Sequence, residues 1–332
     1  MRAIFNRSTD PYFNIASDEF ILDSSEDDVF MLWQNSPAVI IGKNQNTWAE
    51  VDLPFIKERG IAVVRRITGG GAVYHDLGNV NFSFVTRADD SSRLNFEKFT
   101  RPVIRALESL GVKASLDGRN DVVAKGRKIS GNAECVKKNR FGEQMLLHHG
   151  TLLFSSDLSV LEQALTVDPE KIRSRGIESV SSRVANIREL DGYTGPDGAD
   201  EFMAALLREI APGGAQDFSR AEKDEIARRR EEKFSRWEWN WGASPSFETE
   251  RKRRFPFGTV SVMINCRHGE IEKIKFYGDF FGTEDIGVLE DLLTSVKYER
   301  DAVLSALCTA EYDISRCISG ATGREIAELI TG

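Results

Sequence analysis

Residues 65–84 read RRITGGGAVYHDLGNVNFSF, so that three consecutive glycines, Gly69, Gly70 and Gly71, follow closely on an apolar run at 61–64. A backbone without Cβ atoms can adopt positive φ and bring its N–H groups against an anion. Arg65 and Arg66 precede the glycines and carry planar guanidinium groups that suit phosphate oxygens. The pattern favours a loop that holds a phosphate-bearing ligand, although a flexible turn remains the alternative.

Two common nucleotide-binding motifs do not fit this loop. The chain contains no G-x-x-x-x-G-K-[ST] segment, which excludes a P-loop. Gly69 and Gly71 match the first positions of the dinucleotide fingerprint, but Tyr74 stands where its third glycine belongs. Another fold must therefore hold the ligand.

Composition sets limits on the class of protein. The 332 residues are 41% hydrophobic, which allows a sizeable core and two domains. No apolar run approaches the roughly 20 residues of a membrane span, and no export signal is visible. A net charge of −8 disfavours general nucleic-acid binding. The four cysteines form no C-x-x-C pair, so we expect free thiols in a reducing cytoplasm.

The order of apolar periods and turn residues predicts a mixture of helices and strands without strict alternation. Asp10 and Pro11 mark a helix start, and Pro102 either bends a later helix or begins it. Helices are predicted at 11–22, 53–59, 96–110, 160–165, 201–210 and 220–234, and strands at 29–33, 38–41, 61–65, 122–135 (two strands) and 144–154. This arrangement favours an α+β fold over a doubly wound parallel sheet.

A change of composition follows Trp241. Residues 242–256, GASPSFETERKRRFP, combine turn residues with a charge run and predict a linker at 246–256. The run at 251–254 is either a solvated surface or a contact for an acidic protein. Beyond it, 259–266 and 271–277 predict a hairpin, followed by helices near 284–295 and 299–309. We therefore expect a first domain at 1–245 and a small α+β domain at 257–332.

Two further clusters fall in the first predicted domain. Residues 118–133, GRNDVVAKGRKISGNA, place Lys128 after a tight turn and among small residues, where it could reach a carboxylate and a phosphate together. An exposed hairpin lysine is the alternative. Residues 148–153, HHGTLL, predict a strand with a partly buried histidine pair. Cys135 with His148 and His149 matches no standard zinc spacing.

Together these segments resemble the lipoate–protein ligase A family, in its larger form with a C-terminal domain. The similar segments are DPYFNIASDE, VIIGKNQNTW, RRITGGGAVYHDLGN, GRNDVVAKGRKISGNA, HHGTLLFSSDL, RGIESVSSRVANI at 175–187 and WEWNWGASPSF. The resemblance implies a biotin/lipoate-ligase-like catalytic domain with a mixed β-sheet and flanking helices, plus a small α+β C-terminal domain. It further implies that lipoate is first joined to AMP from ATP, with Mg²⁺, and then passed to a lysine of an acceptor.

The resemblance also implies roles for individual residues. Lys128 is the implied catalytic residue, and Asp121 is the candidate for adenine or Mg²⁺ contact. The implied ATP and adenylate contacts are Arg66, Gly70, Gly71, Ala72, Val73, Tyr74, Asp121 and Lys128. The implied lipoate contacts are Gly42, Asn44, Arg66, His75, Lys128, His149 and Gly150, with Asn79 in support and a wall from 39–41. His75 and Asp76 could instead be structural.

The implied partners are the lipoyl domains of 2-oxoacid dehydrogenase complexes and the H protein of glycine cleavage. We expect no nucleic acid, no membrane, no tightly bound structural metal, a monomer and a cytoplasmic location. Two other readings stay open. An octanoyltransferase of the same fold would act without ATP and need a nucleophilic cysteine, for which Cys135 is the only candidate in the catalytic domain. A non-catalytic lipoyl-domain-binding protein would need neither Arg66 nor Lys128.

Overall fold

A mixed sheet of seven strands forms the framework of the computed structural model, which describes residues 1–88, 94–165, 183–241, 249–308 and 313–332. Strand β1 (Arg2–Phe5) pairs parallel with β2 (Val29–Trp33), and the other neighbours are antiparallel. The remaining strands, in sheet order, are β6 (Asn79–Arg87), β10 (Gln144–Leu153), β9 (Arg127–Lys138), β8 (Asp121–Ala124) and β7 (Ala114–Asp117). The predicted α+β class with a mixed sheet is confirmed.

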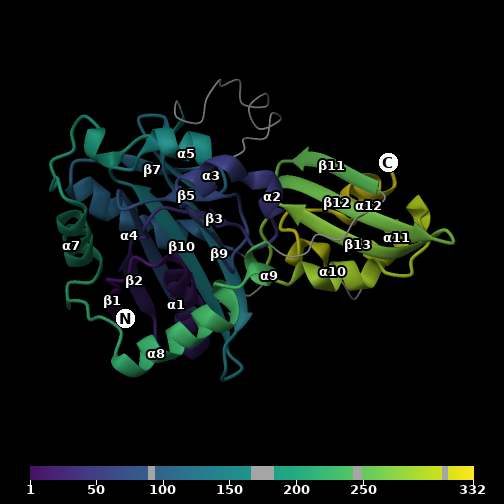
Figure 1. Ribbon diagram of the computed structural model, residues 1–332, viewed down its shortest axis with the longest axis horizontal. Helices are drawn as coiled ribbons and strands as arrows, with labels where there is room; N and C mark the ends of the chain where they lie inside the picture. The colour runs from purple at the N-terminus through teal and green to yellow at the C-terminus, as the bar shows by residue number, and fades with distance from the viewer. Residues whose placement is uncertain (89–93, 166–182, 242–248, 309–312) are drawn as a thin grey trace.

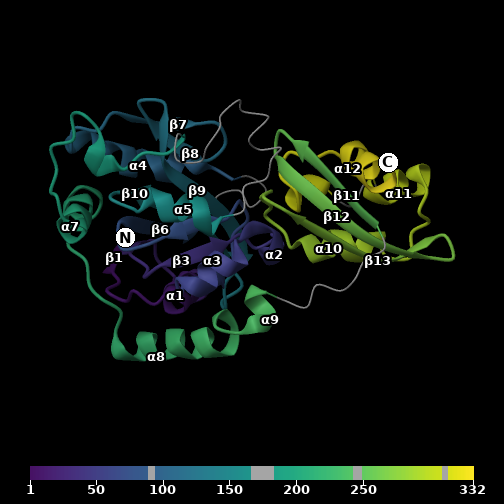
Figure 2. The ribbon, with the colours of Figure 1, turned by 45° about the horizontal axis from the view of Figure 1, so that its top comes forward.

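Both faces of this sheet are buried, because successive side chains of a strand point to opposite sides. On β2, Met31 packs toward α1 (Pro11–Ser24) and α8 (Arg220–Arg229). Its neighbour Leu32 packs toward α4 (Phe96–Ser109) and α7 (Ala199–Ile210). Figure 2 shows α8 along one side of the molecule and α4 and α7 on the other.

A second sheet of three strands carries the glycine loop. Its order is β4 (Ala62–Arg65), β3 (Ala38–Ile41) and β5 (Val73–His75), with β3 parallel to β4 and antiparallel to β5. The glycine loop is therefore the connection between the two outer strands. Gly70 adopts a φ of 89°, which confirms the expected positive φ at this loop.

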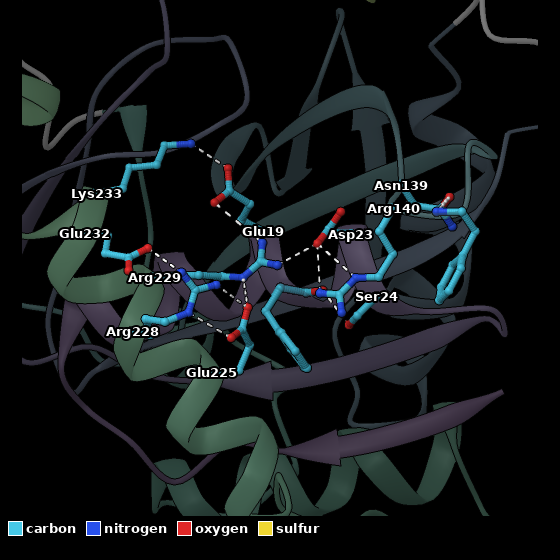
Figure 3. Close-up of polar contacts among 12 residues, drawn as sticks. Glu19, Asp23, Ser24, Asn139, Arg140, Glu225, Arg228, Arg229, Glu232 and Lys233 are labelled. Carbon is cyan, nitrogen blue, oxygen red and sulfur yellow. Dashed lines mark hydrogen bonds and ion pairs between the residues drawn. The ribbon is translucent and has the colours of Figure 1, made fainter.

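Charged side chains join α1 to α8 and to the turn between β9 and β10 (Figure 3). Arg229 donates to Asp23 at 2.5 Å and to Glu225 at 3.1 Å, and Arg140 donates to Asp23 at 2.9 Å. Burial alone would raise the pKa of Asp23, but the hydrogen bonds from the two arginines outweigh it and lower the pKa. The network fixes α8 and the following π-helical turn η3 (Arg230–Phe234) against the domain.

The C-terminal part is a three-stranded antiparallel sheet, β11 (Thr249–Phe255), β12 (Gly258–Arg267) and β13 (Glu270–Gly278). It is covered by α10 (Ile286–Leu293), α11 (Arg300–Leu307) and α12 (Gly323–Thr331) and has its own apolar core. Figure 1 shows it in green and yellow beside the larger part. The predicted linker is wrong for β11, an edge strand whose charged side chains face solvent while its backbone pairs with β12.

Several elements differ from the sequence-based expectation. Strands β1 and β7 and helix α12 were not predicted, and α4 begins at Phe96 and runs through Pro102. Residues 175–182 and 242–247 of the quoted family segments, and residue 309 of a predicted helix, lie outside the described residues. The short elements are α2 (Thr47–Glu50), α3 (Leu53–Glu58), α5 (Leu158–Ala164), η2 (Ile187–Glu189), α9 (Trp237–Asn240) and η4 (Ile314–Arg316).

Candidate active site

A cavity of about 110 Å³ lies between the large sheet, the small sheet and the glycine loop. Residues from α1, both sheets and the loop line it, although they are far apart in the sequence. They are Ile15, Trp33, Ile40, Arg66, Gly70, Gly71, Ala72, Val73, His75, Asn81, Asn120, Lys128, Gly131, Asn132, Ala133, His149, Gly150 and Thr151. The structure thus brings Arg66 and Lys128 to the same cavity.

Arg66 follows β4 and is buried in the cavity wall. Its guanidinium donates to the carbonyls of Gly69 at 2.6 Å, Gly71 at 2.8 Å and Ile40 at 3.1 Å, and to the Thr68 hydroxyl at 3.0 Å. All four acceptors are uncharged. The side chain therefore shapes the glycine loop while its positive charge stays available to an anion in the cavity.

The electrostatic environment of Arg66 supports this role. Burial first, and the neighbouring Arg65 second, lower the pKa of Arg66 to about 9. The guanidinium is still charged at neutral pH. A buried cation whose partners are all neutral is costly, and a bound anion would offset that cost.

A chain of hydrogen bonds links Arg66 to a buried carboxylate. Thr68 Oγ1 accepts from Arg66 and lies 2.6 Å from His149 Nε2, and His149 Nδ1 lies 2.7 Å from Asp18 Oδ2. The other oxygen of Asp18 accepts from the Ser83 hydroxyl at 2.6 Å. The Thr68 hydroxyl finds an acceptor if His149 carries its proton on Nδ1, directed at Asp18. His149 therefore connects the loop to the sheet.

Lys128 stands at the opposite side of the cavity, on β9. Its Nζ lies 2.7 Å from Asp121 Oδ1, and both side chains are partly exposed. The lysine lies over Gly131, where an added Cβ would come within 2.9 Å of Nζ. A glycine here leaves room for the ammonium group beside the cavity.

The two ends of the cavity differ in chemistry. Ile15, Trp33, Ile40 and Val73 make one part apolar, whereas Lys128 with Asn120 and Asn132 makes the other polar. Asn132 is held by reciprocal bonds with Asn120 and by His148, which in turn pairs with the buried Glu134 at 2.8 Å. Such a cavity suits a molecule with an apolar tail and an anionic head.

Four of the predicted site residues do not line the cavity. Tyr74 alternates with its neighbours on β5 and packs instead behind the small sheet. Gly42 lies under the loop, where a Cβ would come within 1.9 Å of the Gly70 carbonyl. The carbonyl of Asn44 accepts from Gly278 N at 2.7 Å, and Asp121 reaches the site through its ion pair with Lys128.

Arg65 was expected beside the phosphate, and here the structure differs. Its side chain points away from the cavity and makes six hydrogen bonds in the 42–47 segment and α9, five to backbone carbonyls and one to the Thr47 hydroxyl. Alternation along β4 explains why two adjacent arginines face opposite ways. Its guanidinium is already occupied by protein acceptors.

The C-terminal part covers the glycine loop. The carbonyl of Phe280 accepts from Gly70 N at 3.3 Å, and the buried Phe281 ring packs on Phe96 and under Arg119, with the guanidinium 4.4 Å from the ring centroid. The sequence analysis missed these contacts. It also missed Asp18, Trp33, Asn35, Asn81 and Asn120, because isolated polar or aromatic residues within strands and helices give no local signal of a site.

Comparison with known proteins identifies the family. Residues 10–211 match the lipoyl protein ligase A/B catalytic domain, and residues 244–330 match the bacterial lipoate protein ligase C-terminus. The chain is 44% identical over 308 residues, 90% of each chain, to lipoate-protein ligase LplJ of Bacillus subtilis. It is 40% identical over 98% of each chain to lipoate–protein ligase 1 of Staphylococcus aureus. The chain belongs to the lipoate–protein ligase family.

Solved structures agree with this lipoate–protein ligase assignment. Plasmodium falciparum LipL1 in complex with lipoate shares the fold over 99% of this chain and 98% of its own, with a TM-score of 0.77 and 24% identity. A lipoate-protein ligase A bound with ATP superposes with a TM-score of 0.60 and 29% identity, over 73% of this chain and 98% of its own. A bipartite ligase from Thermoplasma acidophilum, described with its E2 lipoyl domain, gives 0.62 and 30%, over 75% and 98%.

No group of three or more His, Cys, Asp or Glu side chains within the described ranges is arranged to hold a metal ion. No helix in those ranges is both long and apolar enough to cross a membrane.

Proposed function

We propose that this lipoate–protein ligase joins lipoate to AMP in the cavity and then transfers the lipoyl group to a lysine of an acceptor lipoyl domain. The observation that carries the proposal is the convergence of Arg66 and Lys128 on one cavity whose wall also carries apolar side chains, among them Trp33 and Ile40. The apolar part would take the lipoyl tail, at about 0.8 kcal/mol for each methylene removed from water. The polar part would hold the carboxylate and the phosphates.

The first step joins two anions. A carboxylate oxygen of lipoate attacks the α-phosphorus of ATP, the bond to pyrophosphate breaks, and lipoyl-AMP forms. Lys128 would lie between carboxylate and phosphate, reduce their repulsion and stabilise the charge that develops in the transition state. Arg66, with the backbone of Gly70 to Val73, would hold the phosphates, as the family resemblance implies.

The second step releases AMP. The amine of the acceptor lysine attacks the lipoyl carbonyl, the bond to AMP breaks, an amide forms and the amine loses a proton. Mg²⁺ would enter with ATP and neutralise phosphate charge. Asp121, which pairs with Lys128, is the carboxylate that we propose would contact the metal ion. A magnesium ion that is bound mainly by the phosphates of ATP would need few protein oxygens, which agrees with the single carboxylate of Asp121.

The buried state of Cys135 disfavours the octanoyltransferase reading. Burial raises the pKa of this thiol to about 11, and its side chain belongs to the core around α1 rather than to the cavity. A thiol with so high a pKa forms little thiolate at neutral pH. Cys135→Ala should therefore keep full ligase activity. Complete loss of activity in that variant would favour a covalent route through the thiol.

We assign the chemistry to the N-terminal part, residues 1–245, and an accessory role to the C-terminal sheet and helices. The acceptors we propose are lipoyl domains of 2-oxoacid dehydrogenases and the glycine-cleavage H protein. A monomer and a cytoplasmic location stay predictions, which gel filtration and cell fractionation would test.

ATP–pyrophosphate exchange with lipoate, octanoate and biotin tests the activity. Lys128→Ala should lower exchange with lipoate by about 100-fold or more, because the transition-state charge loses its partner. Lys125→Ala is a matched control, because Lys125 lies on the same hairpin as Lys128 but is exposed and pairs with Asp191. Normal exchange by Lys128→Ala, or equal losses in both variants, would refute the role of Lys128.

A further inference from the structure

One buried histidine at the apolar end of the cavity has a ring nitrogen without a protein partner. His75 is 3% exposed, and its ring lies 6.0 Å from that of Trp33, between centroids. Its Nδ1 lies 3.1 Å from Asn35 Nδ2, whereas Nε2 has no hydrogen-bond partner among the described residues. The residue lines the cavity, so the free nitrogen belongs to the ligand side.

A chain of asparagines fixes which nitrogen of His75 carries the proton. Asn14 Nδ2 lies 2.8 Å from the Ser8 carbonyl and 2.7 Å from the Gln34 carbonyl, so this atom must be the amide nitrogen. It also lies 2.8 Å from Asn35, which must therefore present its oxygen to Asn14. The nitrogen of Asn35 then faces His75 Nδ1 and donates to it.

The proton of His75 consequently lies on Nε2, because Nδ1 accepts from Asn35. Burial first, then the neighbouring Arg66 and His149 side chains, lower the pKa of His75 to about 3. The imidazole thus stays neutral across the physiological range. It offers the cavity an N–H donor and no lone pair, which makes it unsuited to act as a base.

A second donor accompanies it. Asn81 is 1% exposed and lines the same cavity, next to Trp33 across the β2–β6 pair. Its oxygen accepts from Asn79 at 2.9 Å, and its Nδ2 has no partner among the described residues. Two N–H groups therefore line a cavity whose wall also carries Ile15, Trp33 and Val73.

We propose that His75 and Asn81 are specificity-determining residues that donate to the sulfur atoms in the tail of lipoate and so select it over a straight-chain acid of equal length. The proposal rests on the ligase function given above. Sulfur is a weak acceptor in an otherwise apolar ring, which matches two isolated donors in an apolar wall. Octanoate would bury both donors without a partner, and a site with unpaired buried polar groups rejects such an analogue.

The test compares kcat/KM for lipoate and octanoate in ATP–pyrophosphate exchange at saturating ATP. Wild-type protein should prefer lipoate by about tenfold or more, the order expected for an unpaired buried donor. His75→Asn keeps an oxygen for Asn35 but removes the donor near Nε2, and should bring the ratio close to one. His75→Gln places an amide nitrogen near the position of Nε2 and should keep the lipoate preference.

Size effects would act in the opposite direction, since the smaller asparagine leaves more room for the bulky dithiolane ring. A fall in the ratio therefore cannot come from added space. Asn81→Leu, of nearly equal volume, should lower the ratio as well, and it decides the question if thermal unfolding shows that His75→Asn does not fold.

Three results would overturn the proposal: equal use of both acids by wild type, an unchanged ratio in His75→Asn or Asn81→Leu, or loss of preference in folded His75→Gln. Failure of the wild type to exchange with either acid is a different outcome. It would strike the ligase function itself, and with it the proposal.

Discussion

Arg65 and Arg66 are neighbours in the chain, yet they serve two different cavities. Arg65 faces a cavity of about 280 Å³ between the 42–47 loop, α9 and the C-terminal part. The lysines of that cavity are paired with carboxylates, Lys43 with Asp285 and Lys275 with Glu290. Arg65 itself donates to protein carbonyls on every side, so this cavity holds elements together.

The cavity of Arg66 is organised in the opposite way. Donors there outnumber acceptors: Arg66 is charged, and His75 and Asn81 carry N–H groups without partners among the described residues. Lys128 pairs with Asp121, and both side chains are partly exposed. In this molecule, polar groups that have no partner within the protein indicate the position of a ligand better than the type of residue does.

The largest effect is expected from a substitution of Arg66. Arg66→Met should lower kcat/KM for ATP in the exchange reaction by about 100-fold or more, because a buried cation beside the transferring phosphorus is lost. The thermal midpoint should change less than in Arg65→Met, because the carbonyls of Gly69 and Gly71 lose a donor but the cost of burying a cation without a carboxylate partner is removed as well. Activity within threefold of wild type would show that the loop backbone suffices for the phosphates.

Arg65→Met should do the reverse. Its loss removes a donor from the carbonyls of Lys43 and Gln45, and each buried carbonyl left without a donor costs about 1–3 kcal/mol before the loop relaxes. We expect the free energy of unfolding of the N-terminal part to fall by about 3 kcal/mol, measured by urea titration. Exchange activity at low temperature should stay within a few fold of wild type. A stable but inactive variant would contradict the division of roles.

The separate roles of these two residues could not be predicted from sequence. RRITGGG indicated a cationic glycine loop, and the continuous apolar runs of β2 and β3 predicted the bounds of those strands. The run at 61–65 could not say which arginine faces inward, since that depends on the pairing of β4 with β3. Asn35 and Asp18 belong to the site through hydrogen bonds to residues 21 and 131 positions away in the chain, which the local sequence does not reveal.

Edge elements were missed for a related reason. β7 reads ASLD, which alternates but is only four residues long, and β11 reads TERKRRF, which has no apolar alternation. Their stability comes from backbone pairing with a neighbour that is already in place. Pairing of this kind is a property of the folded sheet and leaves little trace in the local sequence.

A third prediction uses the neutral state of His75. Its pKa is about 3 in the folded protein and about 6.5 when unfolded, so the unfolded chain binds the extra proton below pH 6.5. This residue should therefore cost stability progressively as the pH falls from about 6.5 toward 3, by about 1.4 kcal/mol at pH 5.5.

His75→Gln removes this titration and is the matched comparison. The free energy of unfolding, measured by urea titration from pH 8 to pH 5, should fall less steeply in the variant than in wild type, by up to one proton per molecule. Parallel curves would mean that His75 is protonated in the folded state, and the donor assignment at Nε2 would lose its basis.

The smallest effect is expected in the cavity that Arg65 faces. Lys43 and Asp285 pair at 2.7 Å, but the Asp285 side chain is 63% exposed, so water and salt screen the pair. Lys43→Gln should lower the thermal midpoint only slightly, by an amount that corresponds to about 0.5 kcal/mol and shrinks further in 0.5 M salt. Lys43 is the better residue to change, because Asp285 also caps α10 through Gly287 N.

The size of this effect relative to Arg65→Met decides what joins the two parts of the molecule. Carbonyl contacts such as Asn44 to Gly278 and Gly70 to Phe280 are insensitive to salt, whereas an exposed ion pair is not. Lys43→Gln could instead lower the stability as much as Arg65→Met, and added salt could have the same effect on the wild type. Charge would then be what holds the C-terminal part over the glycine loop. The small effect that we expect would mean that backbone hydrogen bonds and Phe281, which packs under Arg119, hold the C-terminal part in this position.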